Sequence, residues 1–438
     1  MKTFSTSYVR HDNCHGRGMF AARLGLWTTA VAAAANFVCA QNDTLRLSYA
    51  DAERLFEERN LLVRTRRLEA TAERSVVPQL MAFDNPFLYL EQNLYNQFTR
   101  TALPLGPEGE TIVQLQQLIR LAGKRIKAAK LQEQSAVVLE TVADEAVRAL
   151  RYELRTALGE LDYFRRVIDF YNRSINQIQE IVVKYREQHA RGNLSLSEKI
   201  RIETLFHDTA VERMEYVMAY SEKEAAVRLL IGETTARPIV AQLDVLSTAT
   251  VPALDSLVQI AYENRPDLKT LRETVNYRRM ALDLEKAGAV PDLSVGYVYD
   301  KAGNYIPNYH AFSLSVNIPV FNRNQGRIQQ AKHLIEAARR ETEYLEQSIR
   351  NDLIQALNQL REVESVYERY GPEYLLEYDR LIAATFENYL KRNLGFLEFV
   401  DIFQSYKQTV LTSERLYNER RQLYEFIAFT CGFKFFER

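Results

Sequence analysis

The residue types that most often carry chemistry are sparse in this 438-residue chain and do not gather into a reactive site. Beyond the N-terminal segment the histidines are His189, His207, His310 and His333, and none of them pairs with another at the spacing of metal ligands. There is no glycine-rich phosphate loop between a strand and a helix. There is also no serine or cysteine nucleophile with a histidine placed to activate it. We therefore expect no enzymatic activity, no metal site and no cofactor.

The cysteines indicate export without an internal disulfide. Cys14 and Cys39 lie in a segment typical of a secretory signal, with basic residues, an apolar run over 24–38 and a small-residue site at Val38-Cys39-Ala40. We predict that residues 1–40 are a signal peptide, which leaves Cys431 alone. We expect Cys431 to be a small buried residue. Lipidation at Cys39 is the alternative, although the residues before it do not form a lipobox.

Glu398 and Asp401 are the carboxylate pair whose spacing is most suggestive. They are three residues apart, so both side chains project from the same face of a helix. The alternative is a solvated helix start, where the helix dipole favours acidic residues. The formal net charge of the chain is −1, which gives no reason to expect nucleic acid as a partner.

These carboxylates belong to the second half of an internal repeat with an offset of about 200 residues. The segment 191–198 (RGNLSLSE) aligns with 391–398 (KRNLGFLE), and Ile231-Gly232 aligns with Cys431-Gly432. We assign residues 41–232 to the first repeat, 233–253 to a linker or equatorial segment, and 254–438 to the second repeat.

Each repeat is predicted to contain a helix, two strands and a helical hairpin. The leading helices cover about 49–81 and 254–288. The strands cover about 87–96 and 111–119, then about 293–300 and 310–320, and the hairpins cover 123–231 and 326–432. The first helix of each hairpin would span ~100 Å if unbroken. Gly371-Pro372 predicts a kink in the second of these long helices.

The last strand has one apolar face and one polar face. Phe312, Leu314, Val316 and Ile318 alternate with Ser313, Ser315 and Asn317. In an exported chain this pattern favours an outer-membrane barrel whose apolar face touches lipid, and a barrel must close because open edges are not tolerated in lipid. Three subunits would supply twelve strands. A small soluble sheet that caps a coiled coil is the alternative.

The chain resembles the TolC-type outer-membrane factors over essentially its whole mature length. The resemblance is carried by four segments: 45–52 (LRLSYADA), 264–268 (NRPDL), 291–296 (PDLSVG) and, most specifically, 317–326 (NIPVFNRNQG). The PVFNRNQG form is similar to the heavy-metal-efflux branch. The resemblance implies a mainly α fold with a small membrane β-barrel: a homotrimer whose twelve-stranded barrel continues as a twelve-helix coiled-coil periplasmic tunnel. It also implies a periplasmic adaptor (membrane fusion) protein and an inner-membrane pump of the RND or ABC type as partners.

The resemblance also implies roles for particular residues. Glu398 and Asp401 would form a periplasmic gate ring, where the first repeat has Glu198 and Arg201. Tyr389 would latch onto Glu198, while the arginine of the family's second link is replaced by Leu394. The two hairpin turns are predicted to dock on the adaptor, through Gly192, Asn193, Leu194, Arg392, Asn393 and Leu394, with Leu194 and Leu394 as exposed apolar residues.

Two functions remain open at this point. The first is a passive exit duct of a tripartite efflux or type I secretion system, in the outer membrane of a Gram-negative bacterium and with a large periplasmic portion. The second is a soluble periplasmic coiled-coil adaptor or scaffold. Paired amphipathic strands in both repeats favour the duct, because an adaptor would not need them twice.

Overall fold

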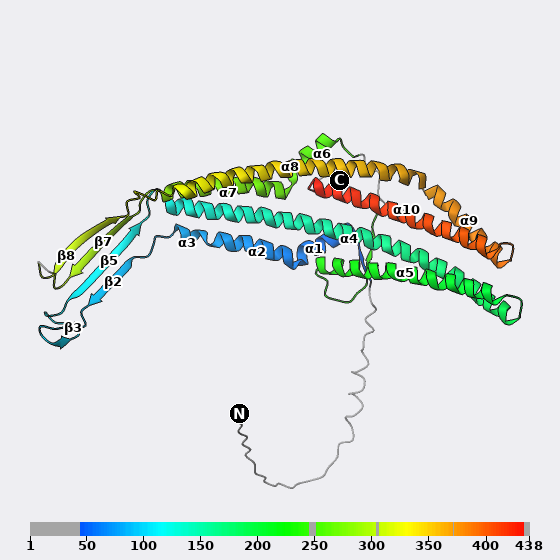
Figure 1. Cartoon of the computed structure of the whole chain (residues 1–438), viewed down its shortest axis with the longest axis horizontal. Coiled ribbons are helices and arrows are strands. Elements are labelled where there is room, and N and C mark those ends of the chain that lie inside the picture. The colour runs from blue at the N-terminus through cyan, green and yellow to red at the C-terminus, as the bar shows by residue number, and fades with distance from the viewer. Residues whose placement is uncertain (1–43, 245–250, 304–305, 371, 433–438) are drawn as a thin grey trace, which may run out of the picture. The chain divides into compact units, whose positions relative to one another are not determined.

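The computed structural model describes residues 44–244, 251–303, 306–370 and 372–432, and the chain from Leu45 onward forms one compact unit (Figure 1). The predicted signal peptide, with Cys39, lies outside the described residues. Among the described helices, none combines the length and the apolar character needed to cross a membrane.

The two repeats follow the same plan of leading helices, two sheet strands and a helical hairpin, although the first has three leading helices and the second has two. In the first repeat these are α1 (Tyr49–Arg59), α2 (Leu61–Ser75), α3 (Val77–Met81), β2 (Phe87–Gln92), β5 (Thr111–Ile119), α4 (Lys124–Ala190) and α5 (Leu196–Leu230). In the second they are α6 (Leu254–Asn264), α7 (Pro266–Gly288), β7 (Leu293–Asp300), β8 (Tyr309–Val316), α8 (Gln325–Tyr367), α9 (Pro372–Leu390) and α10 (Phe396–Thr430). The helices α1 and α6 have 11 residues each, and α5 and α10 have 35 each.

The long helices differ between the repeats. Helix α4 runs unbroken for 67 residues, ~100 Å of helix. Its counterpart is interrupted: α8 ends at Tyr367, a 3₁₀ turn covers Glu368–Tyr370, and α9 begins at Pro372. Proline has no N–H to continue the hydrogen-bond ladder but is tolerated in the first turn of a helix. The predicted interruption is confirmed by the end of α8 and the start of α9, whereas Gly371 itself lies outside the described residues.

The leading helices are broken, whereas the sequence predicted one continuous helix in each repeat. The backbone leaves the helical conformation and becomes extended at Asn60 (ψ 117°), between α1 and α2, and at Arg265 (ψ 121°), between α6 and α7. Asn60 accepts a hydrogen bond from the Val63 N–H at 3.0 Å, and its Nδ2 donates to the Leu230 carbonyl at 2.9 Å. Each break therefore meets the end of the return helix of its own repeat.

Two glycines allow this close approach. Gly232 and Gly432 follow the ends of α5 and α10 with φ of +64° and +78°. A Cβ on Gly232 would lie 3.1 Å from the Arg59 carbonyl oxygen, and one on Gly432 would lie 3.0 Å from that of Asn264. The repeated glycine is thus required both by its left-handed backbone and by the neighbouring backbone.

Four strands form an antiparallel sheet in the order β2-β5-β7-β8. Directly opposed residues share a face, and the row Leu88, Leu115, Tyr297 and Phe312 crosses all four strands. The same face carries Leu90, Val113, Ile119, Leu293, Val295, Leu314 and Val316. The opposite face carries Glu91, Gln114, Gln116, Ser294, Ser313 and Ser315, interspersed with Phe87, Tyr89, Ile112, Leu118, Gly296, Val298 and Ala311. The sheet therefore has one mainly apolar face and one mixed face that is richer in polar residues, with β2 and β8 as its edge strands.

Two predicted strands differ in extent from the observed ones. The strand predicted at 87–96 is interrupted after Gln92, because the Asn93 side chain accepts a hydrogen bond from the Glu110 N–H at 2.8 Å. Beyond it, β3 (Tyr95–Asn96) pairs with β4 (Thr101–Ala102) in a separate small hairpin. Strand β8 ends at Val316, so Ile318 lies beyond it, next to Pro319, which has no N–H for a ladder.

Helix α4 joins the two repeats. It packs against α2 and α5 of its own repeat and against α7 and α10 of the second, while α8 packs against α6, α7 and α10 (Figure 1). A parallel pair, β1 (Leu45–Leu47) with β6 (Ile239–Ala241), covers α4 near Leu154, Leu158 and Leu161. These leucines are fully buried, and each contributes about 1.5–3 kcal/mol of hydrophobic stabilisation.

Candidate functional site

Both helical hairpins end in the same turn, at the end of the helices remote from the sheet (Figure 1). The N–H groups of Asn193 and Asn393 donate to the carbonyls of Gln188 and Asn388, at 2.9 Å in both turns. This hydrogen bond reaches back over the last helical turn, as in a Schellman motif. Gly192 has φ of +79°, and Arg392 takes the same left-handed conformation at +62° although it has a side chain.

The exposed apolar residues of the tips are not the repeated leucines. Leu194 and Leu394 were expected to be exposed, but both are half-buried, and Leu394 packs against the core of the hairpins. Leu196 and Leu397, at the starts of the return helices, are 56% and 74% exposed. Ile200 is 51% exposed one turn further along α5. The apolar contact surface of each tip therefore lies just beyond the turn.

Glu398 and Asp401 lie together on the exposed face of α10, while Phe399 and Phe403 on its other face are buried. Helix α10 begins after Gly395, which offers no side chain to cap it. Within the described part of the chain, neither carboxylate has an ion-pair partner. Both are therefore free to face a pore or a cation.

The equivalent positions in the first repeat have structural roles. Glu198 closes a capping box with Ser195, accepting from the Ser195 hydroxyl at 2.7 Å and from its N–H at 3.2 Å. These hydrogen bonds hold the pKa of Glu198 below its usual value. The Arg201 guanidinium lies 5.9 Å from the centroid of the Phe396 ring. Only the second repeat thus presents the unpaired acidic pair.

Tyr389 is buried between the two hairpins. Its ring stacks on Phe399, with centroids 4.2 Å apart, and on Tyr185, with centroids 5.6 Å apart. Burial and the neighbouring Tyr185 hydroxyl raise the pKa of Tyr389. Its hydroxyl has no hydrogen-bond partner among the described residues, so the predicted latch between Tyr389 and Glu198 is not formed within this subunit and stays a prediction for the assembly.

A partly buried ion pair links the two hairpins. Lys407 Nζ on α10 lies 2.8 Å from both carboxylate oxygens of Glu212 on α5, and the Tyr171 hydroxyl on α4 donates to the same carboxylate at 3.1 Å. The Lys407 side chain is 11% exposed and that of Glu212 is 38% exposed. We call Lys407, Glu212 and Tyr171 the clasp. Aromatic residues surround it, including Phe170, Tyr216 and Tyr406.

Sequence reasoning missed the clasp because its partners are 195 residues apart in the chain. The repeat alignment held one signal: Lys407 and Glu212 replace His207 and Thr412 of the other repeat. The clasp is therefore made once, although the hairpins are duplicated.

On the sheet, the predicted lipid-facing residues are exposed in the subunit. The exposed fractions of Phe312, Leu314, Val316 and Ile318 are 75%, 60%, 43% and 76%. A continuous exposed apolar surface of this kind marks contact with a membrane or a partner.

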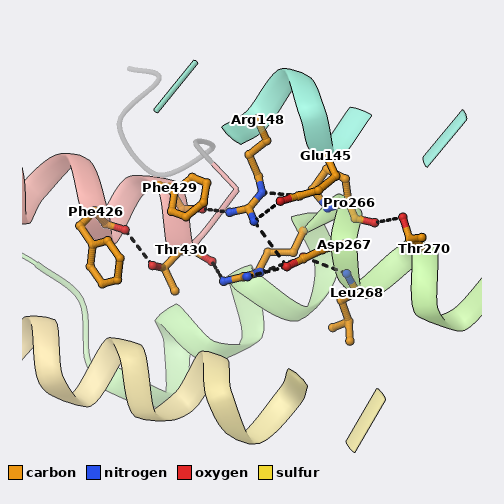
Figure 2. Close-up of polar contacts among 10 residues, drawn as sticks. Glu145, Arg148, Pro266, Asp267, Leu268, Thr270, Phe426, Phe429 and Thr430 are labelled. Atoms are coloured by element: carbon orange, nitrogen blue, oxygen red, sulfur yellow. Dashed lines mark hydrogen bonds and ion pairs between the residues drawn. The ribbon is translucent and has the colours of Figure 1, made fainter. Parts of the chain in front are cut away.

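A polar network near the end of α10 holds the two repeats together (Figure 2). Arg148 on α4 donates to the Phe429 carbonyl at 2.6 Å and lies 3.4 Å from an Asp267 oxygen. Arg265 bonds both oxygens of Asp267, at 3.0 and 2.6 Å, and the Thr430 carbonyl at 3.4 Å. Burial opposes ionisation of Asp267, but the two arginines outweigh it and hold its pKa below the usual value.

Over the described residues, no group of three or more histidines, cysteines or carboxylates could hold a metal ion. His310 shares a 2.6 Å hydrogen bond with the Tyr297 hydroxyl, and His189 lies 2.9 Å from the Leu194 carbonyl. Cys431 is fully buried, as predicted, with Sγ 3.7 Å from the Leu257 carbonyl.

The architecture is that of outer-membrane channels. It matches a crystal structure of CusC, reported for transmembrane channel formation, with a TM-score of 0.70 and 15% identity over 88% of this chain and 92% of that chain. A membrane protein from Pseudomonas aeruginosa matches with a TM-score of 0.71 and 15% identity, over 88% of this chain and 90% of that one. The outer membrane protein VceC of Vibrio cholerae matches with a TM-score of 0.66 and 12% identity, over 88% of this chain and 96% of that one. These identities establish the fold.

Residues 257–368, from α6 to the 3₁₀ turn after α8, match the family model described as outer membrane efflux protein. The cobalt-zinc-cadmium resistance protein CzcC of Cupriavidus metallidurans is 25% identical over 175 residues, which cover 39% of this chain. The alignment spans 41% of the length of that relative. The predicted resemblance to the outer-membrane factors is thereby confirmed, as is the outer-membrane location with a large periplasmic part.

Proposed function

We propose that the protein is the exit duct of a tripartite efflux or type I secretion system. It would conduct cargo passively from an inner-membrane pump and a periplasmic adaptor to the cell exterior. The observation that carries this proposal is the four-stranded sheet, with its apolar and polar faces, at the end of two helical hairpins. The rival function, a soluble adaptor, would leave the exposed apolar face without a partner.

The edge strands explain why a single subunit is not enough. In lipid, unpaired backbone N–H and C=O groups on β2 and β8 would each cost several kcal/mol. Pairing β8 of one subunit with β2 of the next satisfies both edges. Three subunits would close a twelve-stranded barrel with an apolar exterior and the polar face inside. The hairpins would then form the periplasmic tunnel.

The acidic pair on α10 supports cationic cargo. Three subunits would place six carboxylates from Glu398 and Asp401 around the tunnel mouth. Such a ring attracts cations, and mutual repulsion among its charges is relieved when a cation binds. Similarity to CzcC, named for cobalt, zinc and cadmium resistance, agrees with a positively charged cargo.

Single-channel recording of the purified protein in planar bilayers tests the proposal. We expect cation-selective channels that divalent cations block. Replacing Glu398 and Asp401 by alanine should reduce both selectivity and block without preventing trimer formation, whereas Asp208→Ala, an exposed acidic residue elsewhere on the hairpins, should change neither. Absence of channels in protein that inserts as a trimer would refute the duct, and unchanged selectivity in the double variant would refute the gate ring.

A further inference from the structure

The small β3–β4 hairpin lies beyond the four-stranded sheet, at the end remote from the helices (Figure 1). It continues from the edge strand β2 and belongs to the connection 93–110, which leads to β5. In the second repeat only residues 301–308 connect β7 to β8. The longer connection is thus a feature of the first repeat alone.

Hydrogen bonds hold this hairpin in a defined shape. The Asn96 side chain accepts from the Phe98 N–H at 2.9 Å and donates to the Glu108 carbonyl at 2.8 Å. Leu103 has φ of +46°, a conformation that a large side chain disfavours, and its N–H donates to the Leu94 carbonyl at 2.8 Å. A strained backbone that its surroundings hold in place is typical of a functional surface.

The hairpin exposes several apolar side chains in the single subunit. Phe98, at its turn, is 91% exposed, and Leu94, at its base, is 75% exposed. The other exposed apolar residues of the same connection are Tyr95, Leu103 and Leu105. Apolar side chains that gather at the surface in this way mark a site of contact.

A polar row separates these side chains from the apolar face of the sheet. The outermost residues of β2 and β5 on that face are Gln92 and Thr111, and the Thr111 hydroxyl donates to the Gln92 amide oxygen at 2.6 Å. The Lys301 N–H donates to the Thr111 carbonyl at 3.0 Å, and its ammonium group donates to two backbone carbonyls of the connection. Such polar groups mark the edge of the hydrocarbon. The hairpin therefore lies beyond the lipid core, where its apolar side chains require a protein partner.

We propose that the β3–β4 hairpin clamps a second copy of this chain at the exit of the barrel. In the proposed trimer β2 pairs with β8 of the next subunit, so the hairpin that continues from β2 lies beside the outer end of that strand. The chain carries Ile306 and Tyr309 at this end of β8, and they are 58% and 43% exposed. Contact between the two sets would bury both outside the membrane, where the hydrophobic effect favours it. This inference rests on the proposed function, because only closure of the trimer brings β8 of one subunit to β2 of the next.

Crosslinking in the assembled full-length trimer tests the contact. Cys431 is buried, so introduced cysteines can be labelled selectively. Phe98→Cys combined with Ile306→Cys, treated with a bismaleimide, should give covalent dimers and trimers on denaturing gels, whereas each single variant should stay monomeric. Dimers from Phe98→Cys alone would mean that the hairpins meet one another over the exit. Either that result or the absence of dimers from the double variant would overturn the clamp.

The stability of the purified trimer in detergent gives a second readout. Leu94→Ser combined with Phe98→Ser should lower by several degrees the temperature at which the trimer dissociates on heating. Gln97→Ser is the matched control, since Gln97 is an exposed polar residue of the same turn, and it should leave that temperature unchanged. Equal temperatures for the two variants would overturn the clamp. A loss of stability that appears only in lipopolysaccharide-containing vesicles would also overturn it, because the hairpin would then contact lipid.

Conductance of the wild-type protein in planar bilayers keeps the two proposals apart. Trimers that conduct but show neither the crosslink nor the change in dissociation temperature would refute the clamp and leave the duct intact. Assembled wild-type trimers that do not conduct would instead refute the proposed function itself.

Discussion

At the scale of single residues, the clasp shows how one ion pair can couple two hairpins. Lys407 is almost fully buried, so separating α10 from α5 would leave an ammonium group among aromatic rings. Removing one partner of a fully buried pair typically costs about 3–5 kcal/mol. Because Glu212 is partly exposed, water screens this pair, and about 1–3 kcal/mol is the expected range.

Replacing Lys407 with methionine should therefore loosen the hairpins. We expect a higher resting conductance in planar bilayers, together with a lower midpoint of thermal unfolding. In the charge-exchanged double variant, Lys407→Glu with Glu212→Lys, both the resting conductance and the midpoint of thermal unfolding should return part of the way to their wild-type values. Lys391→Met is the control, since Lys391 pairs with Glu387 on an exposed surface of α9. Equal conductance in the Lys407 and Lys391 variants would exclude a role for the clasp in gating.

Asp267 predicts a pH-dependent contribution to stability. Its pKa in the folded protein lies below the usual value near 3.9, so the folded state favours the ionised form. The resulting stabilisation is present above that pH and is lost as the pH falls through the lower folded pKa. Asp267→Asn should lower the thermal midpoint at pH 7, and the difference from wild type should shrink below pH 4. Asp283→Asn, at an exposed ion pair of α7, should have little effect at either pH. A penalty for Asp267→Asn that is equal at both pH values would contradict the electrostatic explanation.

At the scale of elements, the sequence predicted what local patterns determine. The internal repeat, the aligned turn residues and Gly371-Pro372 predicted α4, both hairpin turns and the break between α8 and α9. The break between α1 and α2 at Asn60 was not predicted, because nothing in the neighbouring sequence shows that the Asn60 side chain will contact the Leu230 carbonyl. The same contact is made by Arg265 to the Thr430 carbonyl in the second repeat, so residue type did not reveal the equivalence.

The candidate site divides in the same way. The tips and the acidic pair lie beside repeated motifs and could be found by alignment of the two halves. The clasp depends on which helix faces which, and this is decided by packing between segments 195 residues apart. No local pattern around Lys407 specifies those neighbours.

The sheet offers a test of its own register. Val316 lies on the apolar face, in register with Leu293, and Ser315 lies on the polar face, in register with Ser294. Val316→Arg should cost ~2–4 kcal/mol if this position is near the bilayer midplane, and it should reduce the amount of heat-resistant trimer in outer-membrane fractions. Ser315→Arg, one residue away but on the face that would line the lumen of the proposed barrel, should insert normally. Equal insertion of the two variants would mean that the barrel assignment or its register is wrong.

At the scale of the whole molecule, the two ends of the helices have different requirements. In the proposed duct the sheet would meet lipid and the edges of neighbouring subunits, whereas the tips, with their exposed Leu196, Ile200 and Leu397, would lie in the periplasm. Exposed apolar side chains that gather beside a turn mark a site of contact with a partner. The duplicated tips would give the trimer six similar docking sites. The tip of the first repeat has Gly192 and Ser195 where the tip of the second has Arg392 and Gly395, so the two kinds of site would differ at these positions.

Photo-crosslinking in cells that express the adaptor tests this arrangement. A crosslinking residue at Arg392 adds little strain, because a side chain already occupies that left-handed position, whereas Asn193 is the safer choice beside Gly192. Both should capture the adaptor, and Ala236, exposed in the linker between the repeats, should not. Leu196→Glu and Leu397→Glu should each weaken capture and raise sensitivity to exported compounds, without loss of trimer, because a charge at the centre of an apolar contact must be desolvated. If the adaptor is captured from Ala236 but from neither tip, docking occurs at the equatorial segment, and the exposed leucines then require another partner.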